Sequence, residues 1–268
     1  MDISCVILSW NSEPFIAKCL STLILDLEQS GLSFEIFVVD NGSRDQTVPI
    51  LNALQGQHPD RIVPLCLDHN TGTTYSRNLA LRRANGRYIC ILDSDIEVLP
   101  GAIGRLIHTL EQDGHIGLVA PKSLYPNGNL QKSTDVFPTL FTKAIRYLFL
   151  KLIEKHNNSR AKELTAQRST PFEVDYAVSA MWVFKRELLE RVGFLDERIF
   201  YAPEDVDYCL RIWKAGYKIV FDPAATCIHH TQEISRRRIN RAAMQHILGL
   251  CYYFRKHRYL FVRPKRQL

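Results

Sequence analysis

The first third of this chain alternates between short apolar runs and segments with apolar residues at helical spacing. The apolar runs are rich in β-branched residues and predict buried strands. Alternation of strands and helices predicts an α/β fold with a mostly parallel central sheet and helices on both of its faces. The strands are predicted at 3–8, 34–39, 62–67 and 88–92, and the helices at 12–31, 47–54 and 74–84.

Polar side chains follow each of these predicted strands. They are Asn11, Asp40, Asn70 and the pair Asp93 and Asp95. Parallel strands place their carboxyl ends at one edge of the sheet, where ligands of such folds bind. Two carboxylates there suit a hard divalent cation that also holds phosphate oxygens, and a polar turn closing an ordinary strand is the alternative. The chain has neither GxGxxG nor a P-loop, so side chains and a metal would have to hold a nucleotide.

The second part of the chain continues the same pattern less regularly. Apolar residues on one face predict an amphipathic helix over 137–155, for which a surface helix, a lid, a membrane contact and a dimer contact all remain open. A polar stretch at 157–170 follows it. The other predicted elements are a helix at 100–113, a strand at 117–121, an apolar run at 176–184, a helix at 185–192 and a strand at 219–221.

Two groups of chemically active residues stand in this second part. Glu204, Asp205 and Asp207 begin a predicted helix, directly after Tyr201. The helix dipole favours acids in a first turn, but it accounts for one or two of them better than for three. The adjacent pair His229 and His230 comes after the last predicted strand, and such a pair in a chain rich in placed acids favours metal binding.

The positive charge of the protein is concentrated at its C-terminal end. The 268 residues carry a net charge of +6, and residues 235–268 contain ten Lys and Arg and no acid. The remaining 24 Lys and Arg face 28 Asp and Glu, so the body has a net charge of −4. This distribution argues against nucleic acid as a partner of the body. The tail also contains a predicted amphipathic helix with aromatic residues, which suits an anionic membrane surface or a docked position on the domain.

The composition is that of an ordinary globular protein, with 46% hydrophobic and 23% charged residues. The seven cysteines are scattered without a CxxC pair, which indicates reduced core thiols. Residues 1–5 have no basic segment before an apolar one, and no apolar run is long enough to cross a membrane. We therefore expect a cytoplasmic protein, with peripheral contact at the inner face of the plasma membrane as an option for the tail and the oligomeric state left open.

Taken together, the ordered motifs resemble the inverting family 2 glycosyltransferases of the GT-A fold, especially their bacterial rhamnosyltransferase-like branch. The resemblance covers residues 3–235, and the order and spacing of its motifs make it specific. The motifs are Val6–Asn11, Val38–Ser43, Asn70–Gly72, Arg77–Asn78, Asp93–Asp95, Gly193–Glu197, Glu204–Arg211 and His229–His230. It implies a GT-A domain over 1–234, with a nucleotide-binding half at 1–96 and an acceptor and catalytic half at 97–234, followed by the tail at 235–268.

The resemblance also implies a reaction and a set of site residues. The reaction is metal-dependent transfer of a sugar from a nucleoside diphosphate sugar to a hydroxyl group of a saccharide or lipid-linked acceptor, in bacterial surface polysaccharide synthesis. Asp205 would be the catalytic base, with Glu204 and Asp207 as substitutes and Tyr201 in the same acceptor region. The donor site would comprise Asn11, Asp40, Arg77 and Asp93 for the nucleotide, and Asp93, Asp95 and His229 for Mg²⁺ or Mn²⁺.

The sequence departs from the branch at one motif, and two other functions stay open. The rhamnosyltransferase-like branch often has Asn-Pro-Asp where this chain has Asp93-Ser-Asp95, so both UDP- and dTDP-sugars remain candidate donors. A sugar-nucleotide nucleotidyltransferase would carry a glycine-rich basic loop after the first strand, which Ser9-Trp-Asn-Ser12 is not. A non-catalytic protein that binds nucleotide sugars is the third hypothesis, and the acids at Asp95 and Asp205 argue against it.

Overall fold

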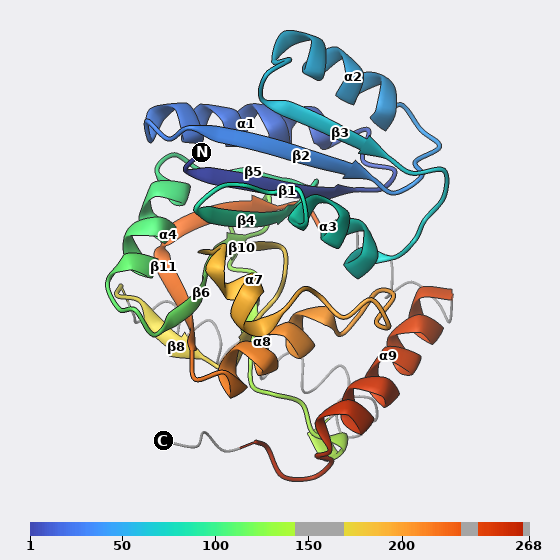
Figure 1. Cartoon of the computed structure of the whole chain (residues 1–268), viewed down its shortest axis with the longest axis vertical. Coiled ribbons are helices and arrows are strands. Elements are labelled where there is room, and N and C mark those ends of the chain that lie inside the picture. Colours follow the sequence, from blue (N-terminus) through green and yellow to red (C-terminus); the bar gives the residue numbers. More distant parts are fainter. Residues whose placement is uncertain (143–168, 232–240, 265–268) are drawn as a thin grey trace.

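The computed structural model describes residues 1–142, 169–231 and 241–264, and Figure 1 shows their arrangement. The strands are β1 (Ile3–Ser9), β2 (Phe34–Asp40), β3 (Ile62–Cys66), β4 (Tyr88–Asp93), β5 (Ile96–Val98), β6 (Ile116–Leu124), β7 (Thr134–Asp135), β8 (Phe172–Val174), β9 (Tyr176–Ala177), β10 (Met181–Lys185) and β11 (Lys218–His229). The helices are α1 (Ile16–Gln29), α2 (Thr47–Gln57), α3 (Thr73–Leu81), α4 (Ala102–Glu111), α7 (Glu187–Val192), α8 (Glu204–Lys214) and α9 (Arg241–His257).

One large sheet organises the domain. Its strand order is β3-β2-β1-β4-β10-β6-β11-β5, with β8 paired to β11. The pairing directions make β3, β2, β1, β4, β6 and β11 run the same way, and β10, β5 and β8 the opposite way. The predicted α/β fold with a mostly parallel sheet is therefore confirmed. A second, small sheet pairs β7 with β9.

The side chains of the sheet alternate between two apolar layers. In β1, Ile3, Cys5 and Ile7 face a core that includes residues of α1 and α4, while Val6 faces a core that includes residues of α3, α7, α8 and α9. Since successive residues of a strand point to opposite faces, a strand covered on both sides must be apolar throughout. This is why β1 and β4 appear in the sequence as continuous apolar runs.

The parallel register brings the polar strand ends together. Ser9 pairs with Asp40 across β1 and β2, and Leu8 pairs with Asp93 across β1 and β4. The following turns are joined as well, because the Asn41 side-chain amide donates to Oδ1 of Asn70 over 3.1 Å. The structure thus confirms that the predicted polar clusters share the carboxyl edge of the sheet.

Strand β11 is much longer than the segment 219–221 that its apolar residues predicted. It continues past Pro223, with an irregular register between Asp222 and Thr226, and ends at His229. A proline removes a ladder hydrogen bond and is tolerated at such an irregularity. Asp222 is fully buried, and its carboxylate accepts from Arg105 Nε at 2.7 Å, from a threonine hydroxyl of α4 and from the backbone N–H of Ala224. These partners stabilise the irregularity between Asp222 and Thr226. The sequence pattern predicted the end of the strand at this position.

The apolar run at 176–184 is divided between two sheets. Tyr176–Ala177 joins the small sheet as β9, and Met181–Lys185 joins the central sheet as β10, antiparallel to β4 and β6. The intervening Ser179 has buried polar partners on α3 and α8. The short strands β5 and β8 were not predicted, because three residues give too little periodicity to detect.

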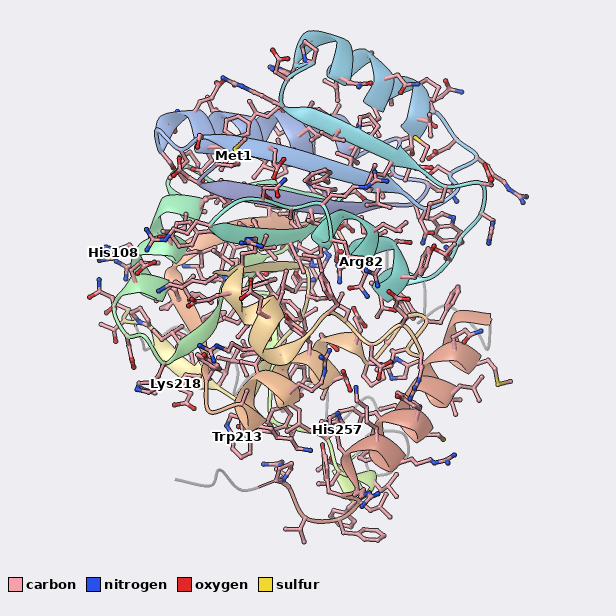
Figure 2. The ribbon with its side chains drawn as sticks, in the orientation of Figure 1. Met1, Arg82, His108, Trp213, Lys218 and His257 are labelled. Carbon is pink, nitrogen blue, oxygen red and sulfur yellow. The ribbon has the colours of Figure 1, made fainter. Side chains whose placement is uncertain are left out.

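Helix α9 packs onto the domain instead of standing apart from it. Tyr253 and Phe254 lie in the same apolar core as the residues of α8. Asp207 of α8 is 1% exposed, and its carboxylate meets Lys256 Nζ at 2.6 Å and His257 Nε2 at 2.8 Å. Figure 2 shows His257 at this junction between α8 and α9. The docked position that the sequence left open is the one found.

Parts of two predicted segments lie outside the described residues. These are most of the amphipathic helix at 137–155, with the polar stretch after it, and residues 232–240 and 265–268 of the tail. Within the described part of the chain, none of the helices combines the length and the apolar composition needed to span a bilayer.

The contacts of Asp207 predict how the stability of the domain depends on pH. Burial opposes ionisation, yet the bond from His257 and the charges of Arg211 and Lys256 lower the pKa of Asp207 to about 2. Because this folded pKa lies below the ordinary value of 3.8, the carboxylate stabilises the fold above that value and loses this effect as the pH falls towards 2. The shift corresponds to about 2 kcal/mol.

We therefore expect Asp207→Asn to lower the free energy of unfolding by about 2 kcal/mol at pH 7, and by progressively less below pH 4. Urea unfolding at pH 7, 5 and 3 measures the difference. Asp113→Asn, which removes one partner of the surface pair with Lys218, is the control and should leave the unfolding midpoint almost unchanged. A difference between wild type and Asp207→Asn that stays constant down to pH 3 would contradict the assignment.

Candidate active site

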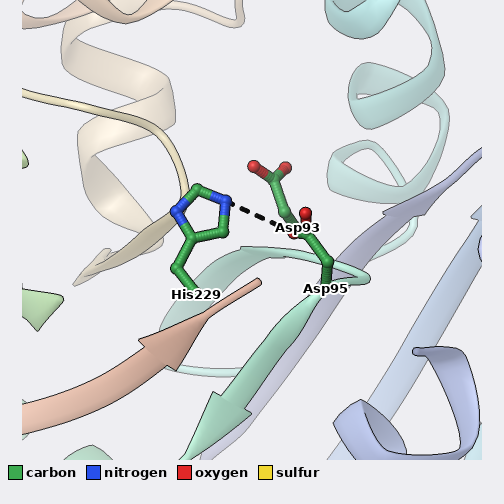
Figure 3. A group of neighbouring side chains, drawn as sticks. All are labelled: Asp93, Asp95 and His229. Carbon is green, nitrogen blue, oxygen red and sulfur yellow. Dashed lines mark ion pairs between the residues drawn. The ribbon is translucent and has the colours of Figure 1, made fainter. Parts of the chain in front are cut away.

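Three side chains with metal-ligating atoms meet at the carboxyl edge of the sheet. Asp93 ends β4, Asp95 follows in the turn before β5, and His229 ends β11. One ligand atom of each lies within 4.8 Å of the others, and His229 Nε2 is 3.4 Å from Asp95 Oδ1 (Figure 3). Strand pairing places His229 beside the two acids, because His229 lies opposite Ile96 in the antiparallel ladder of β11 and β5. The structure thus brings together the three residues predicted to hold a metal.

The neighbouring His230 has a different environment. Its Nε2 lies 2.7 Å from Glu97 Oε1, and its ring packs on Phe15 with 5.3 Å between centroids. Successive residues of a strand point to opposite sides, so two adjacent histidines cannot both face the carboxylate pair. The extension of β11 to residue 229 therefore selects His229.

The electrostatics of the group favour a cation. Burial and the charge of Asp95 raise the pKa of Asp93, against the opposing effect of Arg77. Burial disfavours the charged form of His229, but the bond with Asp95 and the charges of both acids still raise its pKa. Two carboxylates suit a hard cation such as Mg²⁺ or Mn²⁺, and an imidazole nitrogen suits the later transition metals. Mixed oxygen and nitrogen donors fit Mn²⁺ well, and the residues present fit the implied metal.

Arg77 connects this group to the start of α8. Its side chain is 1% exposed, and one nitrogen, Nη2, donates to Asp93 and to the carbonyl oxygen of Ser179. The other, Nη1, donates to Ser179 Oγ at 2.9 Å and lies 3.5 Å from Glu204 Oε1. Arg77, predicted to lie near the nucleotide, is thus a buried bridge between two acidic ends of the site. Ser179 was not singled out in the sequence, although a polar residue inside an apolar run was a usable signal.

The acids Glu204 and Asp205 are adjacent but differ in environment. Glu204 is 8% exposed and accepts from Ser179 Oγ at 2.9 Å. Burial and the charge of Asp205 raise the pKa of Glu204 to about 8, although Arg77 opposes the shift. Asp205 is half-buried, and its Oδ1 accepts from the backbone N–H of Val206 at 2.8 Å. Of the two residues, Asp205 is the more exposed.

Tyr201 and Asp207 complete the group predicted for the acceptor region. Tyr201 is half-buried in the segment that leads into α8, and a cis peptide joins Ala202 to Pro203 after it. Asp207 is not brought to the site, because its buried carboxylate faces the cations of α9. Asp207 is thus engaged in docking α9, and its predicted place as a substitute base has no support in these contacts.

At the other end of the edge, the polar residues bond mainly to one another. Asp40 is 1% exposed, and its carboxylate accepts from the backbone N–H and the hydroxyl of Ser43. Asn11 adopts a positive φ of 49°, donates its N–H to Ser43 Oγ at 2.8 Å and accepts from the N–H of Arg44. These bonds hold two strand-end turns together, and the predicted contact of Asp40 and Asn11 with a nucleotide stays a prediction.

A family model described as "Glycosyl transferase family 2" matches residues 4–193. The chain belongs to this family and carries its glycosyltransferase domain.

Curated relatives agree with the family. An N-acetylglucosaminyl-diphospho-decaprenol L-rhamnosyltransferase of Mycobacterium tuberculosis is 24% identical over 234 residues, which cover 84% of this chain and 75% of that protein. The succinoglycan biosynthesis protein ExoO of Rhizobium meliloti is 25% identical over 246 residues, covering 90% of this chain and 64% of that one. An uncharacterised protein of Sinorhizobium fredii is 28% identical, and the match spans 21% of its length. The chain thus corresponds to only part of some relatives.

Solved structures share the fold. A mannosyltransferase of Pyrobaculum calidifontis, solved with GDP-Man and Mn²⁺, has a TM-score of 0.65 at 20% identity, over 98% of this chain and 65% of that one. TarS residues 1–349 of S. aureus, solved with UDP-GlcNAc, has a TM-score of 0.56 at 17% identity, over 97% of this chain and 74% of that one. The expected GT-A fold is confirmed.

The two adjacent histidines provide a matched test of the metal group. We expect His229→Ala to weaken Mn²⁺ binding at least about tenfold, because it removes one of three ligands, and His230→Ala to leave it nearly unchanged. Isothermal titration of Mn²⁺ into each variant in the presence of UDP measures the affinities. Equal losses in both variants would show that His229 has no special place in the site.

Proposed function

We propose that this domain transfers a sugar from a UDP- or dTDP-sugar to a hydroxyl group of a saccharide or lipid-linked acceptor, with inversion of the anomeric carbon, in the synthesis of bacterial surface polysaccharide. The observation that carries the proposal is the Arg77 bridge. It joins Asp93 of the metal-ligating group to the head of α8, where the half-buried Asp205 follows the buried Glu204. A donor end and an acceptor end are thereby held in one site.

The donor end would bind the nucleoside diphosphate. Asp93, Asp95 and His229 would hold Mg²⁺ or Mn²⁺, and the bound cation would offset negative charge on the diphosphate as it leaves. Asp40 and Asn11 would lie on the nucleotide side of the same edge. A nucleoside diphosphate sugar as the class of donor is supported by the mannosyltransferase solved with GDP-Man and Mn²⁺ and by TarS solved with UDP-GlcNAc. The nucleotide bases of these two donors differ, so the base that this domain binds has to be found by experiment.

The acceptor end would supply the base. As the acceptor oxygen forms its bond to the anomeric carbon and the bond to the diphosphate breaks, the acceptor hydroxyl loses a proton. The half-buried Asp205 would take that proton, whereas Glu204 is buried against Ser179, and its raised pKa of about 8 favours its protonated form below that pH. A single displacement of this kind inverts the anomeric carbon. The rhamnosyltransferase and succinoglycan relatives support a cell-surface saccharide as product.

The role of Asp205 gives a direct test. We expect Asp205→Asn to reduce kcat by a factor of about 10² to 10⁴, the usual contribution of a general base, while donor binding stays intact. The rate of nucleoside diphosphate release with a UDP- or dTDP-sugar and acceptor measures transfer, and the thermal shift produced by the donor measures binding. The exposed Glu187 at the head of α7, changed to Gln, is the control and should keep full activity.

Two outcomes would contradict the proposal. Full activity of the Asp205→Asn variant would remove Asp205 from the mechanism. Release of pyrophosphate from a nucleoside triphosphate, without nucleoside diphosphate release from any nucleotide sugar, would identify a nucleotidyltransferase in its place.

We further propose that the C-terminal region contacts an anionic membrane surface, as befits a lipid-linked acceptor. Phe261 and Val262 are 71% and 72% exposed, and the exposed Arg255, Arg258 and Arg263 surround them in the chain. Exposed apolar side chains beside cations suit the interface of an anionic bilayer, where each cation contributes about 1 kcal/mol. Tyr253 and Phe254 belong to the core, so removal of the whole tail is not a clean test.

Substitution of surface arginines tests this contact without disturbing the core. We expect the triple variant Arg255→Gln, Arg258→Gln and Arg263→Gln to bind phosphatidylglycerol vesicles about 10- to 100-fold more weakly in co-sedimentation. The control triple variant changes Lys18, Arg83 and Arg186, which are also exposed, to Gln. Equal weakening in both triple variants, or no vesicle binding by the wild type, would contradict the membrane contact.

A further inference from the structure

The segment that leads to Asp205 is held at both of its ends by one side chain of α9. Lys256 Nζ lies 2.7 Å from Asp196 Oδ2 and 2.6 Å from Asp207 Oδ1. Asp196 stands near the start of the connection between α7 and α8, and Asp207 stands in the first turn of α8. Tyr201 and Asp205 lie between these two anchors. One ammonium group therefore ties together the two ends of the segment that carries the proposed base.

The backbone of α9 touches the middle of the same segment. Gly249 is buried, and a Cβ placed on it would overlap the carbonyl oxygen of Ala202, two residues before Glu204. Any side chain at position 249 would therefore have to push α9 and residues 202–203 apart. Glycine is disfavoured inside a helix, so the close approach is a physical reason for its presence here.

The opposite side of the segment rests on α3. Thr73 N–H donates to the carbonyl oxygen of Phe200 at 2.6 Å, and Thr74 Oγ1 donates to that of Ile199 at 2.7 Å. Gly72 at the start of α3 leaves room for the Phe200 ring. The segment thus lies between α3 and α9, as the ribbon in Figure 1 also shows.

We propose that α9 is a positioning element of the active site, with Lys256 and Gly249 fixing the segment 196–207 against α3 and thereby the place of Asp205. The inference rests on the proposed function of Asp205. It assigns the C-terminal helix a role in transfer that is separate from any membrane contact. Lys256 and Gly249 are positioning residues, because each acts through the segment and not on a substrate.

The first test changes Lys256. We expect Lys256→Met, which keeps the aliphatic stem and removes the charge, to speed hydrogen exchange of residues 196–207 at least about tenfold more than exchange of β2. We also expect kcat to fall about tenfold at unchanged donor KM, and Lys256→Arg to restore both. Lys185→Met is the matched control. Lys185 and Lys256 are 24% and 23% exposed, and each pairs with an acid.

The second test changes Gly249. The added Cβ would overlap the carbonyl oxygen of Ala202, so we expect Gly249→Ala to lower the melting temperature whether or not α9 positions the segment, although alanine is the better helix former. If α9 positions the segment, the same change accelerates exchange in 196–207 and lowers kcat. Leu248→Ala, at a neighbouring position that is 56% exposed, should do neither. Unchanged exchange of 196–207 in both Lys256→Met and Gly249→Ala would overturn the proposal.

The two proposals can fail separately. Hydrogen exchange needs no substrate, so it tests the positioning by α9 even in a protein that transfers no sugar. If Lys256→Met and Gly249→Ala change hydrogen exchange as expected but Asp205→Asn remains active, Asp205 is not the base and the positioning by α9 stands. Loss of transfer in Asp205→Asn without any effect of Lys256 or Gly249 would do the reverse.

Discussion

The buried guanidinium group of Arg77 is the interaction on which the rest of the site depends. A charge that is 1% exposed is costly unless it is paired and hydrogen-bonded. Its partners come from three separate places in the chain: Asp93 at the end of β4, Ser179 before β10 and Glu204 at the start of α8. Pairing this one cation therefore requires the end of β4, the residues before β10 and the start of α8 to lie close together.

The three acids at the head of α8 show how burial and partners separate similar residues. Glu204 is buried beside a hydroxyl and another carboxylate, and its pKa rises to about 8. Asp207 is also buried, but a hydrogen bond with His257 and the charges of Arg211 and Lys256 lower its pKa to about 2. Asp205, between them, is half-buried. A buried acid with a raised pKa, a structural ion pair and a half-buried carboxylate thus arise within one turn of helix.

The C-terminal helix combines two environments on opposite sides. Its inner side supplies Tyr253 and Phe254 to the core and Lys256 to the half-buried Asp196 and the buried Asp207. Its outer side exposes Met244, Ile247 and Leu248. The excess positive charge of the tail is therefore not all available for an external partner, because Lys256 pairs with Asp196 and Asp207 inside the domain. Net charge along a sequence does not distinguish these two uses.

The sequence by itself determined the α/β alternation and the polar carboxyl edge with its two acids, Asp93 and Asp95, because continuous apolar runs and strand-end acids are local signals. The structure decided that His229 joins these acids and that His230 does not. It did not determine the direction of β10, the extension of β11 through Pro223 to His229, or the partners of Arg77 and Asp207. Those features depend on hydrogen bonds and ion pairs between residues far apart in the chain, such as Arg77 with Glu204 and Asp207 with Lys256. Such pairs leave no periodic trace in a sequence, so the tertiary structure alone decided which acids became buried partners of cations and which is half-buried at the site.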